Sequence, residues 1–207
     1  MLPRLYAIVD AGVVAARRVR LEDFAQALRA AGVELVQYRD KLGSPQEVLR
    51  AAKVLRGATG GGNCCLIMND RADLAVLAGF DGVHVGQGDL LPEDARRVLG
   101  TTGWVGLSTH TDEQVAAAES SCADYVAIGP VFATGTKMDA ERVVGLEGIR
   151  GARALTNKPL VAIGGITRAN ARSAIDAGAD SVAVISGLFA EGESVEKVAR
   201  DFLELLR

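Results

Sequence analysis

Short apolar runs recur along this chain, and they constrain its fold more than any other feature. Eight of them stand out, at residues 5–10, 33–40, 64–70, 81–87, 104–110, 124–130, 159–165 and 181–187. Each run is almost continuously apolar and lacks the polar alternation of a half-exposed strand. This pattern predicts parallel strands that are covered on both faces.

The segments between these runs have the spacing of amphipathic helices. Leu21, Phe24 and Leu28, for example, fall on one helical face. Ser44 and Glu47 flank the start of another predicted helix, in the arrangement by which a serine and a glutamate cap a helix reciprocally. An Ala-Gly pair stands before the second, fourth and eighth runs, where glycine is expected to end the preceding helix.

Eight strands that alternate with helices, with no linker or composition break between them, predict one α/β domain over residues 1–207. We expect a small (β/α)8 TIM barrel, because the whole pattern fits within the 207 residues of the chain. A doubly wound open sheet with fewer strands is the alternative. At 49% hydrophobic residues, the chain has enough apolar side chain to fill such a core.

Charge and hydropathy narrow the class of partner. A net charge of -3 argues against a general nucleic-acid surface, so small molecules are the expected partners, and a homo-oligomer remains open. No apolar run approaches the roughly 20 residues of a membrane span, and the first residues lack the pattern of a signal peptide, so we expect a cytoplasmic protein. Cys64 and Cys65 are adjacent in a predicted strand, which sends them to opposite faces and predicts no disulfide framework.

In a barrel of this kind the active site lies at the C-terminal ends of the strands, and here nearly every predicted strand ends in polar or glycine residues. In chain order they are Asp10; Gln37, Arg39, Asp40 and Lys41; Asn69 and Asp70; Gln87 and Asp89; Ser108 and His110; Thr134, Thr136 and Lys137; Gly164 and Gly165; Ser186 and Gly187. His84 lies inside a strand instead, where a hydrogen-bonded barrel or interface histidine is the expected role.

The end of the second strand predicts an anion site. Alternation sends Gln37, Arg39 and Lys41 to one face, and a guanidinium beside an ammonium suits a phosphate or diphosphate. Lys137 approaches the same rim from the sixth strand. The alternative is a structural salt bridge from Arg39 or Lys41 to Asp40 or to a carboxylate of a neighbouring loop.

Asp70 and Asp89 end adjacent predicted strands, so their carboxylates are expected to approach one another. They repel unless a proton or a cation lies between them, and Mg²⁺ accepts one or two protein carboxylates together with waters and phosphate oxygens. An acid and base pair for hydrolysis is one alternative, and a helix N-cap role for Asp70 is another.

Glycines after the seventh and eighth strands predict a second anion site. Gly164, Gly165 and Gly187 lie where backbone N–H groups can approach a ligand, and the loops after these strands commonly bind phosphate in barrels. Tight turns also require glycine, so the prediction depends on the barrel context.

Taken in order, these segments resemble thiamine phosphate synthases along the whole chain. The motifs that carry the resemblance are "QYRDK", "NDR", "GQGD" and "GPVFATGTK", supported by "GLSTHT", "VAIGGI" and "ADSVAVISGLF". The resemblance implies a transferase that joins hydroxymethylpyrimidine diphosphate to thiazole carboxylate phosphate, giving thiamine phosphate, diphosphate and carbon dioxide.

The resemblance also implies roles for individual residues. It places the pyrimidine diphosphate against Gln37, Tyr38, Arg39, Asp40, Lys41, Asn69, Ser108 and Lys137. It places the thiazole phosphate against Thr134, Gly135, Thr136, Gly165, Ile185 and Ser186. It gives Asp70 and Asp89 to Mg²⁺, and it makes Arg39, Lys41, Ser108 and Lys137 the groups that neutralise the departing diphosphate.

Two other functions remain possible from the sequence. A related thiazole tautomerase would need a proton-moving group such as His110 and no metal. A non-catalytic barrel would bind thiamine precursors or a partner protein as a regulator. The paired aspartates with Lys41 favour the synthase. Residues 131–143 are the predicted lid, because they follow Pro130 and contain few apolar anchors.

Overall fold

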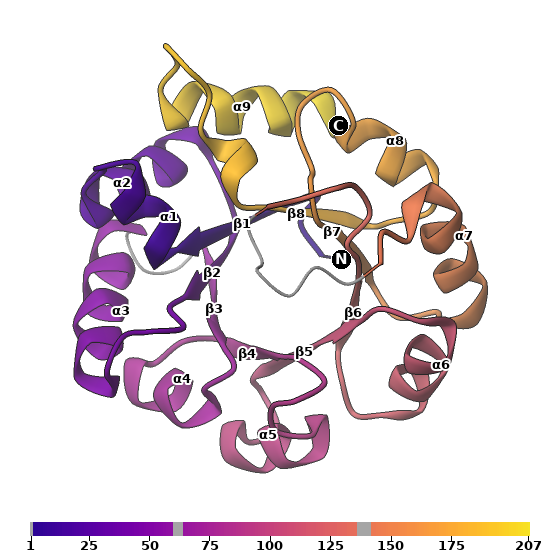
Figure 1. The fold of residues 1–207 in the computed structure, drawn as a ribbon. Coiled ribbons are helices and arrows are strands. Elements are labelled where there is room, and N and C mark those ends of the chain that lie inside the picture. Colours follow the sequence, from indigo (N-terminus) through magenta and orange to yellow (C-terminus); the bar gives the residue numbers. More distant parts are fainter. Residues whose placement is uncertain (1, 60–63, 136–141) are drawn as a thin grey trace.

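The computed structural model describes residues 2–59, 64–135 and 142–207. Eight parallel strands close into a barrel in chain order, with helices around the outside (Figure 1), which confirms the predicted fold. The strands are β1 (Leu5–Asp10), β2 (Leu35–Arg39), β3 (Cys65–Asn69), β4 (Gly82–Val85), β5 (Trp104–Thr109), β6 (Tyr125–Ile128), β7 (Leu160–Ile163) and β8 (Ser181–Val184).

A helix follows each strand, and at two places the chain adds a further helical element. Two helices follow β1, and a 3-10 turn precedes the last helix after β8. The helices are α1 (Ala11–Ala16), α2 (Leu21–Ala31), α3 (Pro45–Thr59), α4 (Ala72–Ala78), α5 (Pro92–Leu99), α6 (Asp112–Ser120), α7 (Gly145–Leu155), α8 (Ala171–Asp176) and α9 (Val195–Leu205), with η1 at Ser186–Leu188. Within the described ranges, none of them has the length and hydropathy of a membrane span.

Local sequence accounts for several helix ends. The Ser44 amide donates to the Glu47 carboxylate at 2.8 Å, and the Glu47 amide donates back to Ser44 Oγ at 3.4 Å, so the predicted capping box forms at the start of α3. The glycines of the Ala-Gly pairs have φ angles of 88° at Gly32, 65° at Gly79 and 116° at Gly178. These left-handed angles favour glycine and end the helices before β2, β4 and β8.

Apolar side chains form two separate clusters. The smaller fills the barrel interior and includes Tyr6, Ile67 and Tyr125, whereas the larger lies between the strands and the surrounding helices. Cys65 packs against the interior cluster and Cys64 against the outer one, as strand alternation predicts.

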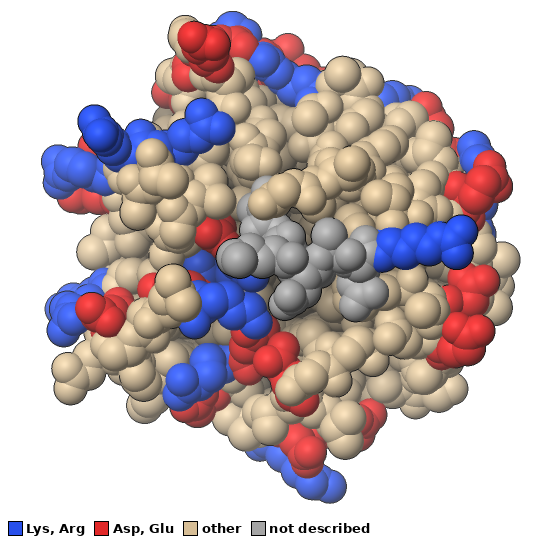
Figure 2. All heavy atoms as spheres, viewed as in Figure 1, with Lys and Arg blue, Asp and Glu red and all other residues tan. Residues whose placement is uncertain are grey.

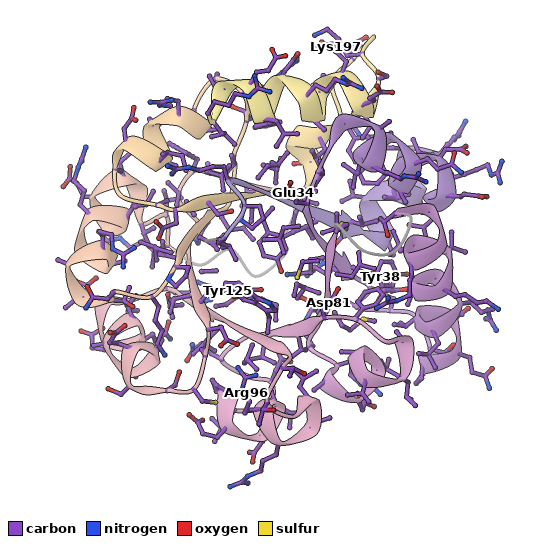
Figure 3. The ribbon with its side chains drawn as sticks, turned by 180° about the vertical axis from the view of Figure 1, so that it is seen from behind. Glu34, Tyr38, Asp81, Arg96, Tyr125 and Lys197 are labelled. Carbon is purple, nitrogen blue, oxygen red and sulfur yellow. The ribbon has the colours of Figure 1, made fainter. Side chains whose placement is uncertain are left out.

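The N-terminal edge of the barrel carries a repeated carboxylate contact. Asp81, Asp124 and Asp180 stand just before β4, β6 and β8, and each accepts a backbone N–H from the preceding strand. The donors are the amides of Leu66 at 2.8 Å, Val105 at 2.7 Å and Leu160 at 2.8 Å. Figure 3 views the barrel from this side and labels Asp81 and also Arg96, which pairs with Asp124. These contacts join consecutive strands at the edge away from the predicted site.

Candidate active site

The predicted polar residues that the structure describes lie at or just after the C-terminal ends of the strands. These strand ends form the face toward the viewer in Figure 1. In the same view, Figure 2 shows positive and negative side chains side by side over β2, β3 and β4. This side of the barrel mouth is therefore the charged part of the candidate site.

Arg39, at the end of β2, and Lys41, in the loop after it, each contact a carboxylate at the end of a neighbouring strand. The Arg39 guanidinium pairs with Asp10 at the end of β1, and the Lys41 ammonium pairs with Asp70 after β3. Asp10 also accepts the Val13 amide at 3.0 Å, so its carboxylate is fixed by the start of α1. The predicted salt-bridge alternative is therefore confirmed for carboxylates of neighbouring strand ends. The same pairs keep both cations at the barrel mouth, where a bound anion could replace the carboxylates as their partner.

Tyr38 and Asp40 shape the loop after β2. The Asp40 carboxylate accepts the amides of Leu42 at 3.1 Å and Gly43 at 2.8 Å, and it accepts the Tyr38 hydroxyl at 3.2 Å. Tyr38 packs in the outer cluster, between the strands and the helices (Figure 3). The structure thus shows structural contacts for these two residues, and their predicted contact with substrate stays a prediction.

Asp70 and Asp89 meet, as their strand positions predict. Asp70 has a φ of 61°, and its amide donates to the carbonyl of His84 at 2.7 Å. Burial raises the pKa of Asp70; the Lys41 ammonium opposes this shift, and a hydrogen bond with the Asp89 carboxyl adds to it. The Asp89 carboxylate also accepts the Gly86 amide at 2.8 Å. Two carboxyls in contact need a shared proton or a cation.

The N-cap alternative for Asp70 is wrong. Helix α4 begins at Ala72, its N-cap residue is Arg71, and no side chain makes the cap hydrogen bond. The left-handed backbone turns Asp70 out of the capping position and toward Lys41. An aspartate with positive φ is uncommon, and such angles gather at functional sites.

The donor set around Asp70 and Asp89 fits Mg²⁺ better than it fits a softer metal. Among the described residues, no group of three or more His, Cys, Asp and Glu side chains could hold a metal ion. Two carboxylates at an open mouth leave positions for waters and phosphate oxygens, which is the ligation that Mg²⁺ prefers.

Asn69 presents a buried amide nitrogen that lacks a hydrogen-bond partner among the described residues. Its Nδ2 is one of two buried side-chain polar atoms in the described part of the chain with no hydrogen bond, the other being Arg56 Nε. Asn69 ends β3 and pairs in register with His84 of β4. Leaving a buried N–H donor without an acceptor costs about 1–3 kcal/mol, so the position suits a ligand that supplies an acceptor.

A line of hydrogen bonds crosses the barrel interior beneath this face. Gln37 Nε2 donates to the Tyr6 hydroxyl at 2.8 Å, and the hydroxyls of Tyr6 and Tyr125 are 2.9 Å apart. His84 Nδ1 lies 3.1 Å from the Tyr125 hydroxyl, and His84 Nε2 lies 2.8 Å from Ser108 Oγ. The line joins the predicted site residues Gln37 and Ser108, and it confirms that His84 is a hydrogen-bonded barrel histidine.

Sequence reasoning missed Tyr6 and Tyr125. Both lie within apolar runs, where a tyrosine is expected to be packing, and the sequence gives no indication that two hydroxyls from β1 and β6 meet. Strand alternation does place Tyr6 on the same face of β1 as Ile8, which was the one available indication that it points inward.

The loops after β6, β7 and β8 form the other side of the mouth. Gly164 and Gly165 have φ angles of 100° and 63°. A Cβ on Gly165 would lie 2.6 Å from the carbonyl oxygen of Ala133, so the residue must be small for the loop after β6 to approach. Thr134 follows in that loop and is half-buried, with exposed Gly135 next to it. The glycines are thus explained by close loop packing, and their contact with phosphate stays a prediction.

Ile185 and Ser186 lie directly after β8, where η1 begins. Thr136 and Lys137 fall outside the described residues. The lid prediction for residues 131–143 is wrong about the first two positions, because Val131 is buried and Phe132 packs against the core. Their amides donate to Ile163 at 2.8 Å and Gly164 at 3.0 Å, which ties this part of the segment to β7.

His110 has a different environment from His84. Its Nδ1 lies 2.6 Å from the carbonyl oxygen of Gly129, and its amide donates to the Gln114 side chain at 2.7 Å. Because a carbonyl can only accept, Nδ1 carries the proton, and Nε2 is the basic nitrogen of the neutral ring.

Comparisons with known proteins find one family that matches most of the chain. The family model described as thiamine monophosphate synthase matches residues 5–188. The thiamine-phosphate synthase of Koribacter versatilis is 53% identical over 99% of this chain and 96% of its own length. That of Chloroflexus aurantiacus is 40% identical over 98% of this chain and 92% of its own.

Solved structures give the same result. The thiamine phosphate pyrophosphorylase from Pyrococcus furiosus superposes with a TM-score of 0.84 at 32% identity, covering 98% of this chain and 95% of that one. A structure titled "Native KDPGal structure" has a TM-score of 0.72 at 21% identity over 99% of this chain and 94% of that one, which shows a shared fold alone. The match of the family model over most of the chain, and the full-length relatives, show that the chain belongs to the thiamine monophosphate synthase family.

Proposed function

We propose that the protein condenses hydroxymethylpyrimidine diphosphate with thiazole carboxylate phosphate to give thiamine phosphate, with release of diphosphate and carbon dioxide. The observation that carries the proposal is the contact between Asp70 and Asp89 beside the Lys41 ammonium, at the mouth of a barrel that belongs to this family. A metal-binding pair next to a cation suits a diphosphate leaving group.

The donor side of the site is the edge formed by β2, β3 and β4. Arg39 and Lys41 exchange their contacts with Asp10 and Asp70 for phosphate oxygens, and Asn69 Nδ2 supplies the hydrogen bond that it does not make within the described protein. Asp70 and Asp89 would hold Mg²⁺, and a bound Mg²⁺ would neutralise charge on the diphosphate. Lys137 is proposed to approach from the loop after β6.

The acceptor side is the edge formed by the loops after β6, β7 and β8. Thr134, Gly165 and Ser186 are proposed to hold the monophosphate of the thiazole through hydroxyl and backbone N–H donors. Gly135, Thr136 and Ile185 complete this proposed set. Holding the acceptor phosphate at a fixed edge positions the thiazole nitrogen near the pyrimidine methylene carbon, and such positioning can supply several kcal/mol of the barrier reduction.

The reaction then needs no protein nucleophile. The bond between the pyrimidine methylene carbon and oxygen breaks, and the electron pair leaves with the diphosphate. The thiazole nitrogen donates its lone pair to the resulting carbocation. The bond between the ring carbon and the carboxylate then breaks, carbon dioxide leaves, and the electron pair left on the ring carbon takes a proton from water. The cations and the Ser108 hydroxyl stabilise the departing charge, which is the step that this arrangement favours.

We also propose that the enzyme works in the cytoplasm, because both substrates carry phosphate charges that do not cross a lipid bilayer unaided.

The test is a direct assay with both substrates, with and without Mg²⁺, in which thiamine phosphate is measured. Product that depends on both Mg²⁺ and the pyrimidine diphosphate supports the proposal. Conversion of the thiazole phosphate alone, without metal, would instead identify a tautomerase, and binding of both compounds without conversion would identify a non-catalytic barrel.

A further inference from the structure

The interior line from Gln37 to Ser108 has a direction that can be derived from its donors and acceptors. Gln37 Nε2 can only donate, so the Tyr6 hydroxyl accepts from it and uses its own hydrogen toward Tyr125. Tyr125 then donates to His84 Nδ1, the ring carries its proton on Nε2, and Nε2 donates to Ser108 Oγ. The hydroxyl hydrogen of Ser108 is therefore not used within the line and is free for a partner outside it.

The opposite direction satisfies the line less well. If Ser108 donated to His84 Nε2, the neutral ring would carry its proton on Nδ1 and donate it to the Tyr125 hydroxyl. Tyr125 would then donate to Tyr6, which already accepts from Gln37 at 2.8 Å. The Tyr6 hydrogen would then need another acceptor, at a side chain only 1% exposed. Burial also raises the pKa values of both tyrosines well above the ordinary value, so both phenols keep their hydrogens.

The backbone leaves room for this line at one position. Gly106 of β5 lies against the Tyr125 and His84 side chains, and a Cβ there would come within 2.1 Å of Tyr125 Cζ and 2.4 Å of His84 Nδ1. Glycine at this strand position therefore makes space for the hydrogen bond between the two rings.

We propose that Tyr6, Tyr125 and His84 are positioning residues, which orient the Gln37 amide and the Ser108 hydroxyl as one unit and present Ser108 to the substrate as a hydrogen-bond donor. The direction of the line rests on the structure alone. The identity of the acceptor, an atom of the bound pyrimidine diphosphate, rests on the proposed function. A substrate group that takes the Ser108 hydrogen is then an acceptor, which makes the line a determinant of specificity.

The two histidines of the chain allow the direction to be measured without substrate. In protein labelled with ¹⁵N-histidine, the ring nitrogen shifts distinguish the two neutral tautomers, and only His84 and His110 contribute. We expect His84 with its proton on Nε2 and His110 with its proton on Nδ1. A His84 ring with its proton on Nδ1, or a charged ring at neutral pH, would overturn the proposal.

The two tyrosines should respond differently to loss of their hydroxyls. Tyr6→Phe leaves the contacts from Tyr125 to Ser108 in place, so the His84 tautomer should not change. Tyr125→Phe removes the donor to Nδ1, and the ring should shift toward a mixture of tautomers. Equal responses of the His84 shifts to both substitutions would contradict the derived direction. Thr109→Val is the matched control, because it removes a buried hydroxyl that bonds to the Ala127 carbonyl at 2.9 Å and contacts no member of the line.

Kinetics test the link to substrate. We expect Tyr125→Phe to lower kcat/KM for the pyrimidine diphosphate about tenfold, the usual effect of one lost buried hydrogen bond, with the KM for thiazole phosphate unchanged. Added to Ser108→Ala, the same substitution should cause little further loss, because its effect passes through Ser108. Losses that multiply, or an equal rise in both KM values, would overturn the positioning role. If the wild-type protein forms no thiamine phosphate, the proposed function fails, and the tautomer measurement decides the direction of the line by itself.

Discussion

The two edges of the barrel use the same kinds of charged residue in different ways. At the N-terminal edge, Asp180 accepts both the Leu160 amide at 2.8 Å and the Arg153 guanidinium at 2.9 Å, so its charge is matched within the protein. At the C-terminal edge, Asp70 contacts the ammonium of Lys41 and also a second carboxyl, Asp89, and Asn69 Nδ2 has no partner among the described residues. Matched charges stabilise the fold, whereas unmatched ones are available to a ligand.

Polar residues at the N-terminal edge thus serve the structure, and those at the C-terminal edge remain available for function. Arg153 also donates to the carbonyls of Thr156 and Lys158, which covers the end of α7 and the start of β7. Substitutions at this edge should lower stability and leave the chemistry alone. Substitutions at the opposite edge should lower activity or substrate affinity without lowering stability.

The largest effect is expected at Asp89. Asp89→Asn removes the carboxylate of the proposed Mg²⁺ pair, and we expect at least about a hundredfold loss of kcat, comparable to losing a main electrostatic contact in an active site. The melting temperature should change little, because the substitution relieves the repulsion with Asp70. Rates are measured over a Mg²⁺ titration, with Asp94→Asn, in an exposed pair with Arg97, as the control. An unchanged rate would remove Asp89 from the metal site.

A smaller effect, on stability alone, is expected at Asp180. Asp180→Ala leaves the Leu160 amide and the Arg153 guanidinium without this acceptor, and it should lower the free energy of unfolding by about 2 kcal/mol. Urea denaturation measures this change, and kcat at 25 °C should stay at the wild-type value. Asp176→Asn, in an exposed pair with Arg172, is the control and should have almost no effect on stability. A fall in kcat of the folded variant would show that the two edges are not independent.

Asn69 should show opposite effects on stability and activity. Asn69→Leu replaces an amide whose buried Nδ2 has no partner among the described residues, so the free energy of unfolding without substrate should rise by about 1 kcal/mol. The same variant should lose affinity for the pyrimidine diphosphate, which calorimetry can measure. A stability loss together with normal affinity would mean that the amide serves the fold.

The smallest effect is expected in a half-exposed ion cluster at the outer surface. Glu193 pairs with Arg168 and Lys197, and these cations, Arg168 first, lower its pKa from 4.5 to about 2. Because the folded-state pKa is depressed, the contribution of this carboxylate to stability is present above about pH 4.5 and is lost as the pH falls toward 2. Thermal unfolding from pH 5 to 2.5 should depend less on pH in Glu193→Gln, and 1 M salt should reduce the difference.

Much of the fold and of the site could be predicted from local sequence. The apolar runs located all eight strands, although several runs extend one to three residues beyond the strand. At the mouth the reason is that the residues after a strand no longer form the hydrogen bonds of the sheet. The paired aspartates, the cations of β2 and Asn69 follow directly from the ends of these runs, since parallel strands bring their C-terminal ends together.

Other features depend on which strands become neighbours across the barrel. Asp10 as the partner of Arg39, and the role of Asp70 outside helix capping, follow from the spacing between β1, β2 and β3 in the closed sheet. Tyr38 sits in the outer cluster by strand alternation, yet its sequence motif groups it with the substrate-binding residues.

The sequence by itself determined the barrel and the residue types at its mouth, because strand periodicity and strand ends are local properties of the chain. Only the tertiary structure decided that Tyr6 and Tyr125, which are 119 positions apart, share a hydrogen bond inside the barrel. The physical reason is closure: eight strands joined in a ring bring distant side chains into one interior too narrow for water to separate their polar groups.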